Sequence, residues 1–216
     1  IAATGPEASV RADHPHATIV DCERGVLTLG FVDSHTHAIF GRARYAEQEL
    51  RAAGVPYMEI ARRGGGIHAS VRDLRTRSDD DLFALAAPRL RALAECGVTT
   101  VEVKSGYGLT LVDEIRTLRV IQRLAAALPM RIIPTWLGAH EVPQEDRERL
   151  HGRREYIDLL LHEMPPVGAS ARLARFAAVF CAPGVVPCEE SRTILAAAGP
   201  DGRGTHTQAE PHHTAW

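Results

Sequence analysis

Residues 30–37 read Gly-Phe-Val-Asp-Ser-His-Thr-His, an apolar strand that closes with two histidines. Alternate residues of a strand point to the same side, so His35 and His37 can approach one ion while Thr36 points away. Imidazole nitrogen is a good ligand for zinc and iron(II). A bare His-x-His pair is more often a pair of surface histidines. This pair closes an apolar run, which is where sites lie in parallel sheets, and it therefore predicts a metal site.

Predicted strands and helices alternate along the rest of the chain, which indicates a parallel α/β fold, either an open sheet or a (β/α)8 barrel. Strands are predicted at Val98–Val103, Arg131–Leu137 and Ala177–Cys181. Helices are predicted from Ser78 to Gly97, at Asp113–Leu128, Arg153–Glu163 and Glu189–Ala198, and near Ala169–Phe176.

Local signals mark the ends of the first of these helices. Ser78 is a typical N-cap and is followed by three aspartates, which the helix dipole favours in a first turn. Gly97 stands where a C-terminal glycine is common. Pro88 interrupts the pattern and predicts a kink.

The first 29 residues differ from this core. Short strands are expected around Val10, Ile19–Val20 and Val26–Leu27, separated by polar turns. We interpret residues 1–29 as the remnant of a small β domain.

Composition excludes several classes of protein. The chain has 216 residues and a formal net charge of -2, which gives no basis for binding nucleic acid or an anionic membrane. It has no apolar run near 18 residues and no visible signal peptide, so we expect a cytoplasmic protein. Its four cysteines form no Cys-x-x-Cys pair and are expected to be buried or partly buried free thiols rather than disulfides.

Several separate motifs, in the right order, resemble the imidazolonepropionases of the amidohydrolase superfamily from about Gly30 to Ala198. After the paired histidines they are Phe40-Gly41-Arg42-Ala43-Arg44, Tyr57-Met58-Glu59-Ile60-Ala61-Arg62, Gly64-Gly65-Gly66-Ile67, Val101-Glu102-Val103-Lys104-Ser105-Gly106-Tyr107-Gly108 and Leu137-Gly138-Ala139-His140. The resemblance implies a TIM-like (β/α)8 barrel of the amidohydrolase type and one zinc or iron(II) ion.

The resemblance also assigns roles to individual residues. His35 and His37 would be the first two metal ligands, and the cation of Arg44 would bind the substrate carboxylate. Tyr57, Tyr107 and His140 would line the substrate pocket. Alternatives stay open: Arg44 as a solvated loop residue, Tyr57 as a helix-packing residue, and His140 as a hydrogen-bonded core histidine. Lys104 is interpreted as a structural or supporting residue.

The last part of the chain departs from the family pattern. His206 is the candidate for the third metal ligand, but residues 199–204 precede it instead of an apolar strand, and Ala209 stands where an acidic or amide residue is expected. We divide the chain into residues 1–29, a partial metal-dependent hydrolase barrel at residues 30–198, and an atypical polar tail at 199–216. About five of eight strands are expected, without the family's sixth-strand histidine and eighth-strand aspartate.

The implied activity is metal-dependent hydrolysis of the cyclic amide of 4-imidazolone-5-propanoate to N-formimidoyl-L-glutamate in histidine degradation. Two alternatives remain: another amidohydrolase, such as a heterocyclic-base deaminase, or an inactive truncated fragment that binds metal. The expected partner is the small-molecule substrate, with a possible homodimer.

Overall fold

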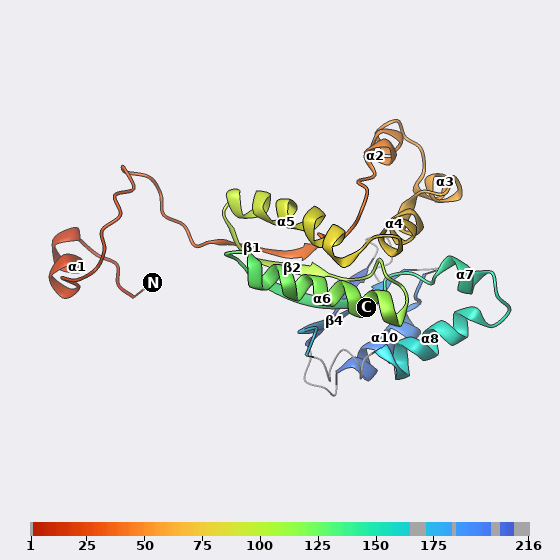
Figure 1. The fold of residues 1–216 in the computed structure, drawn as a ribbon. Coiled ribbons are helices and arrows are strands. Elements are labelled where there is room, and N and C mark those ends of the chain that lie inside the picture. Colours follow the sequence, from red (N-terminus) through yellow and green to blue (C-terminus); the bar gives the residue numbers. More distant parts are fainter. Residues whose placement is uncertain (1, 165–171, 183–184, 200–203, 210–216) are drawn as a thin grey trace.

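The computed structural model describes residues 2–164, 172–182, 185–199 and 204–209, without the side chains of Tyr57, Met58, Ala61 and Ala209. The described chain forms one parallel sheet with the strand order β1-β2-β3-β4-β5 (Figure 1). The strands are β1 (Phe31–Thr36), β2 (Val98–Lys104), β3 (Arg131–Ala139), β4 (Phe176–Cys181) and β5 (Gly204–Ala209).

Helices make the connections between the strands. They are α2 (Tyr45–Ala52), α3 (Tyr57–Arg62), α4 (Gly66–Arg75) and α5 (Asp79–Glu95) between β1 and β2; α6 (Leu111–Ala127) between β2 and β3; α7 (Gln144–Arg147) and α8 (Gly152–His162) between β3 and β4; and α10 (Cys188–Ala198) between β4 and β5. Parallel neighbours with helical crossovers are the arrangement predicted from the alternating pattern.

The sheet is curled, as in half of a barrel, so the expected incomplete TIM-like barrel is confirmed. A cavity of ≈350 Å³ is lined by residues of all five strands, which together are Val32, Asp33, Ser34, Thr100, Glu102, Ile133, Phe176 and His206. In a complete barrel such inward-facing side chains fill the centre in layers.

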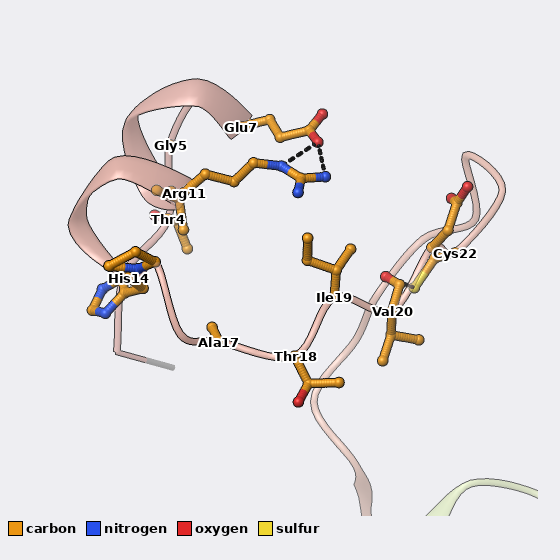
Figure 2. Close-up of a pocket in the computed structure, with 14 residues that line it drawn as sticks. Thr4, Gly5, Glu7, Arg11, His14, Ala17, Thr18, Ile19, Val20 and Cys22 are labelled. Atoms are coloured by element: carbon orange, nitrogen blue, oxygen red, sulfur yellow. Dashed lines mark hydrogen bonds and ion pairs between the residues drawn. The ribbon is translucent and has the colours of Figure 1, made fainter.

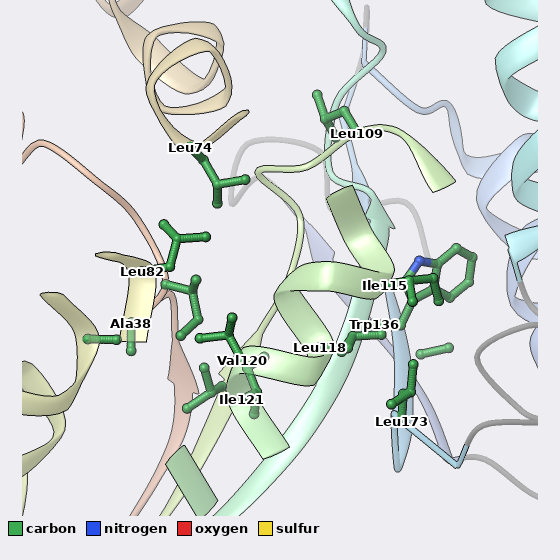
Figure 3. Close-up of a cluster of buried hydrophobic side chains, with 14 of the residues drawn as sticks. Ala38, Leu74, Leu82, Leu109, Ile115, Leu118, Val120, Ile121, Trp136 and Leu173 are labelled. Carbon is green, nitrogen blue, oxygen red and sulfur yellow. The ribbon is translucent and has the colours of Figure 1, made fainter. Parts of the chain in front are cut away.

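Helices α5 and α6 pack against each other, and α6 also packs against β3. The apolar period predicted for α6 is confirmed, because Leu118, Ile121 and Leu124 are fully buried. Figure 3 shows Leu82, Leu118 and Ile121, which belong to one cluster of buried residues together with Ile115 and Trp136. This packing between helices and sheet is the core of the molecule.

The helix predicted after Ser78 is confirmed as α5. The Ser78 hydroxyl accepts a hydrogen bond from the Asp81 backbone N–H at 3.1 Å, and the Asp81 carboxylate accepts the Ser78 N–H at 3.2 Å, which is a capping box. Pro88 lies inside α5, which continues to Glu95.

Strand β5 lies within residues 199–216, the segment that we interpreted from the sequence as an atypical polar tail. It pairs with β4 from Phe176 opposite Gly204 to Cys181 opposite Ala209, so His206 does lie on a fifth strand. Thr205 and Thr207 are exposed. Backbone pairing rather than burial stabilises this strand, so its sequence has no apolar run from which a strand could be predicted.

The short strands expected in residues 1–29 are not formed. Val10 lies in the helix α1 (Glu7–Asp13), and no strand precedes Phe31 in the described residues. Ile19, Val20 and Val26 are exposed, Val26 to 90%. A β-strand needs a neighbour to satisfy its backbone groups, and these segments have none here. The division into a small β domain remains a prediction.

The helix predicted near Ala169–Phe176 falls partly outside the described residues. Its predicted end is wrong, because Phe176 is the first residue of β4 and pairs with Thr135. Its ring is half-buried.

The expected burial of the cysteines is wrong for three of the four. All four thiols are free, but Cys22, Cys96 and Cys188 are exposed and Cys181 alone is buried. Among the helices in the described ranges, none combines the length and the apolar character that crossing a lipid bilayer requires.

Replacing Leu118 tests the packing of α6. Its side chain is fully buried, so we expect Leu118→Ala to lower the free energy of unfolding by about 2–5 kcal/mol in urea titrations. Val112→Ala is the matched control on the same helix, because Val112 is 71% exposed. Equal losses in the two variants would contradict the assigned orientation of α6.

Candidate active site

Three side chains meet where β1, β2 and β3 end. The His37 and His140 rings are stacked with their centroids 4.8 Å apart. The Tyr107 ring lies 5.2 Å from that of His37 and 5.3 Å from that of His140. Adjacent parallel strands bring their carboxyl ends to one edge of a sheet, so residues far apart in sequence form one cluster.

The two histidines of the first strand lie side by side, with ring centroids 5.6 Å apart. Burial, reinforced by His140, His35 and Lys104 nearby, lowers the pKa of His37 to about 2. Burial, then the Lys104 ammonium, also lowers the pKa of His35. Both rings are therefore neutral near pH 7, the form that coordinates metal ions.

His37 has a further feature that suits a cation. Its Nδ1 atom is buried and has no hydrogen-bond partner among the described residues. A buried polar atom without a partner is rare, because its lost hydration is not replaced. The neutral ring has one nitrogen lone pair for a metal ion and one N–H, for which the Ser105 backbone carbonyl is an acceptor.

His140 is held by the backbone of the loop that carries Tyr107. Its Nδ1 lies 2.8 Å from the Gly106 carbonyl oxygen, which can only accept, so Nδ1 carries the proton and Nε2 the lone pair. Burial lowers the pKa of His140 to about 4. Gly106 has a φ of +103°, and a Cβ there would lie 2.9 Å from the Leu137 carbonyl oxygen. Only glycine fits this close approach.

The carboxylate of Glu114 shapes the same loop from inside the protein. It is fully buried and accepts backbone N–H bonds from Gly106, Gly108 and Leu109 at 2.8–3.1 Å. Burial raises its pKa. The N–H donors replace water around the carboxylate and thereby fix the backbone on both sides of Tyr107.

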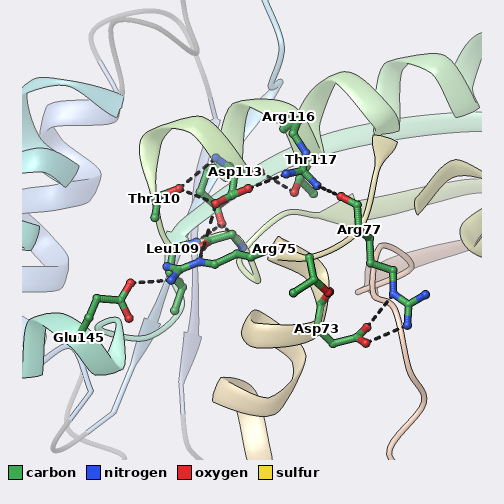
Figure 4. A network of polar contacts seen from close by, with 12 residues as sticks. Asp73, Arg75, Arg77, Leu109, Thr110, Asp113, Arg116, Thr117 and Glu145 are labelled. Atoms are coloured by element: carbon green, nitrogen blue, oxygen red, sulfur yellow. Dashed lines mark hydrogen bonds and ion pairs between the residues drawn. The ribbon is translucent and has the colours of Figure 1, made fainter. Parts of the chain in front are cut away.

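Arg75 of α4 joins the outer side of this loop to two helices (Figure 4). Its Nε donates to the Gly108 carbonyl oxygen at 2.8 Å, and its NH1 pairs with Glu145 of α7 at 2.5 Å. Its Nε also lies 3.8 Å from the Asp113 carboxylate at the start of α6. The loop is thus held from both sides.

Arg89 of α5 supports the chain after the paired histidines in the same way. Its guanidinium donates to the carbonyl oxygens of Ala38, Phe40 and Gly41 at 2.6–3.0 Å. It also stacks over the Phe40 ring at 3.5 Å. These contacts position the chain directly after His37.

Arg44 lies beside this cluster. A cavity of ≈520 Å³ is lined by His37 and Tyr107 and also by Arg42, Arg44 and Arg51. Arg44 is half-buried and pairs with Glu47 at 3.0 Å, while the Glu47 carboxylate also accepts the Gly66 N–H at 3.1 Å. The volume suits a small molecule, and the arginines favour an anionic one.

His206 contacts a buried ion pair on the concave side of the sheet. The Lys104 ammonium lies 2.5 Å from Glu102 and 2.8 Å from His206 Nε2, and Glu102 lies 3.1 Å from that nitrogen. Thr135 donates to Glu102 at 2.5 Å. Burial, then Lys104, lowers the pKa of His206. An ammonium can only donate, so Nε2 is the acceptor in its contact with Lys104.

The structure brings some predicted residues together and not others. His35, His37, Tyr107, His140 and Arg44 lie in one region, whereas the Tyr57 side chain lies outside the described residues. In the part of the chain that the structure describes, no three histidine, cysteine or acidic side chains are grouped closely enough to hold an ion. The ligand roles of His35, His37 and His206 remain predictions.

A second hollow, of ≈1030 Å³, carries none of the predicted site residues. Figure 2 shows it between α1 and the segment around Ile19, with the Glu7–Arg11 ion pair at its rim. The segment extends away from the sheet (Figure 1). It brings no strand end into the hollow, so the cavity beside Arg44 is the better candidate.

Sequence reasoning missed Glu114 and Arg89. Glu114 lies next to Ile115 on the apolar face of α6, and an acid on such a face is a signal that could have found it. Arg89 carries no such signal, because its partners are backbone carbonyls about 50 residues away in sequence.

Comparison with known proteins agrees with this arrangement. The chain is 46% identical over 214 residues to an imidazolonepropionase of Symbiobacterium thermophilum, covering 97% of this chain and 50% of that protein. It is 44% identical to one of Myxococcus xanthus, over 91% of this chain and 47% of the relative. It is 49% identical to one of Aeromonas salmonicida, over 74% of this chain and 38% of that relative. No protein-family model matches.

The resemblance seen in the sequence is therefore confirmed, and the chain spans about half the length of the curated relatives it matches. The aligned region of the first relative extends beyond Gly30–Ala198, where the motifs lie.

Breaking the buried ion pair tests its contribution to the fold. Lys104→Met leaves the Glu102 carboxylate buried without its cation, so we expect a loss of about 3–5 kcal/mol in the free energy of unfolding, measured by urea titration. Lys104→Met combined with Glu102→Leu should recover most of this loss. Arg63→Met removes only an exposed pair with Glu59 and is the control. A double variant less stable than Lys104→Met would contradict this account.

Proposed function

We propose that the chain is the N-terminal and central part of an imidazolonepropionase, which hydrolyses the cyclic amide of 4-imidazolone-5-propanoate to N-formimidoyl-L-glutamate in histidine degradation. The observation that carries the proposal is the meeting of His37, Tyr107 and His140 at three neighbouring strand ends beside an arginine-lined cavity. Identity of 44–49% to imidazolonepropionases supports it.

One zinc or iron(II) ion completes the proposed site. The donors fit such an ion, because His35 and His37 are neutral neighbours and His37 Nδ1 is buried without a partner in the described chain. His206 is the proposed third ligand. When bound, the ion supplies a hydrolytic nucleophile near neutral pH by lowering the pKa of water.

The protein's own residues bind and orient the substrate. Arg44 can form two parallel hydrogen bonds to the propionate carboxylate, and its contact with Glu47 holds it at the cavity wall. Anchoring the carboxylate places the ring next to His37 and Tyr107, which line the same cavity. Fixing the ring in one orientation lowers the entropic part of the barrier.

His140 is suited to accept a hydrogen bond from the ring. Its Nδ1 proton is engaged by the Gly106 carbonyl, so Nε2 presents a lone pair. With its pKa lowered to about 4, the imidazole stays neutral at pH 7 and this lone pair stays available. His140 would then orient a ring N–H of the substrate.

Metal binding tests the first part of the proposal. We expect the purified chain to bind one zinc ion in equilibrium dialysis. His37→Asn should weaken binding by more than the roughly 10–100-fold that loss of a supporting residue costs. His68→Asn is the control, because His68 lies on α4 and lines a different cavity. Zinc binding that is unaffected by His37→Asn would overturn the ligand assignment.

Turnover separates the proposal from its rival. Ring opening of imidazolone propanoate by the metal-loaded chain, measured as loss of its ultraviolet absorbance, would support the hydrolase. One bound ion without ring opening would instead favour a metal-binding fragment.

Replacing Arg44 tests substrate binding separately. Loss of a charge-assisted contact should weaken binding of imidazole-4-propanoate by about 10–100-fold in Arg44→Met, measured by calorimetry. Binding of the uncharged propanamide should be the same in the two proteins. Arg63→Met, at an exposed position just after α3, is the control. Equal losses of affinity for the propanoate and the propanamide would show that Arg44 does not bind the carboxylate.

A further inference from the structure

Two thiols approach each other at the end of β4. Cys181 is the last residue of β4 and Cys188 the first residue of α10, and their Sγ atoms are 3.2 Å apart. Both are free thiols. The Cys181 side chain is buried and Cys188 is exposed, so one partner is shielded and the other is open to reagents.

Backbone contacts build this approach. Cys181 forms a bridge with Val186, and the Ala182 N–H donates to the Val186 carbonyl oxygen at 3.1 Å. The Ser191 N–H then donates to the Pro187 carbonyl oxygen at 2.9 Å in the first turn of α10. The end of the strand and the start of the helix are therefore held together independently of the sulfur atoms.

The separation is close to that of a bond. A disulfide needs about 2.05 Å between its sulfur atoms, so an approach of roughly 1 Å closes it. Once one of the two sulfurs has been oxidised, the other reaches it far faster than a thiol of another chain can, because the effective concentration of the neighbouring thiol is high.

We propose that Cys181 and Cys188 are a redox modification site, which forms a reversible intrachain disulfide when the chain meets a peroxide. The inference does not depend on the proposed hydrolase activity. It goes beyond the expectation of inert free thiols.

The peroxide forms the disulfide in two steps. The Cys188 thiolate attacks one peroxide oxygen, the O–O bond breaks, and Cys188 becomes a sulfenic acid as hydroxide leaves. The Cys181 thiolate then attacks the Cys188 sulfur, the S–S bond forms, and a second hydroxide leaves. The two thiol protons convert both hydroxides to water. The two sulfurs are oxidised by two electrons and the peroxide is reduced.

The exposed thiol is the better first reactant. Burial and the neighbouring Cys188 raise the pKa of Cys181, which keeps it protonated and slow to attack peroxide. Cys188 is reached from solvent. The order of the two steps follows from this difference.

The disulfide would join β4 to α10 next to the candidate active site. Phe180 precedes Cys181, and its ring lies 6.0 Å from that of His140. A link here fixes the carboxyl end of β4, the edge of the sheet at which the site residues gather.

The experiment treats the folded chain with hydrogen peroxide, blocks remaining thiols with iodoacetamide, and maps the peptides without reduction. We expect a linked peptide containing Cys181 and Cys188, so that both of these thiols are lost. Reduction with dithiothreitol should restore both. Cys188→Ser, which changes an exposed side chain, should form no such link.

A trapping arm tests the proposed order. Dimedone labels sulfenic acids, and Cys181→Ala removes the resolving thiol. We expect a dimedone adduct on Cys188 in Cys181→Ala, and at least about tenfold less adduct in the parent chain, where the disulfide forms first. Circular dichroism confirms that each variant is folded.

Cys22 and Cys96, both exposed, report whether the peroxide has acted. The proposal is overturned if these two are oxidised while Cys181 and Cys188 remain open to iodoacetamide. It is equally overturned if Cys188 is found joined to Cys22 or Cys96 in place of Cys181.

Discussion

Parallel pairing of β1, β2 and β3 is the constraint on which the rest of the molecule depends. The register places Thr36 opposite Val103 and Lys104 opposite Thr135, so β1 and β2 end at the same level, and β3 continues from there to Ala139. His37 directly follows β1 and His140 directly follows β3, while Tyr107 lies in the loop after β2, and the three rings lie within 4.8–5.3 Å of one another. A slip of one residue would turn alternate side chains to the other face and disperse the cluster.

Buried charges complete what the pairing begins. Glu114 binds the backbone of the Tyr107 loop, and Arg89 binds the carbonyls after His37. The Lys104–Glu102 pair holds His206 on the concave side. Each group is costly to bury alone, and each is stabilised by partners that fix a loop or a ring. The same contacts therefore serve stability and place the site.

The N-terminal segment and β5 show what pattern reading does not capture. Apolar residues around Ile19 and Val26 look like strands, but they remain exposed because no neighbouring strand pairs with them. The polar segment around His206 does not look like a strand, yet β4 offers it a complete set of backbone partners. Strand formation depends on the neighbour as much as on the residues themselves.

The sequence by itself determined the alternating α/β order, the periods of α5 and α6, and the pair of histidines that ends the first strand. These features are local, because the spacing of apolar residues and the capping residues at helix ends indicate them directly. Tertiary structure alone decided that Glu114 supports the loop, that Arg89 reaches carbonyls about 50 residues away, and that Cys181 meets Cys188. These contacts depend on distances between segments, which chain folding sets and which no local pattern contains.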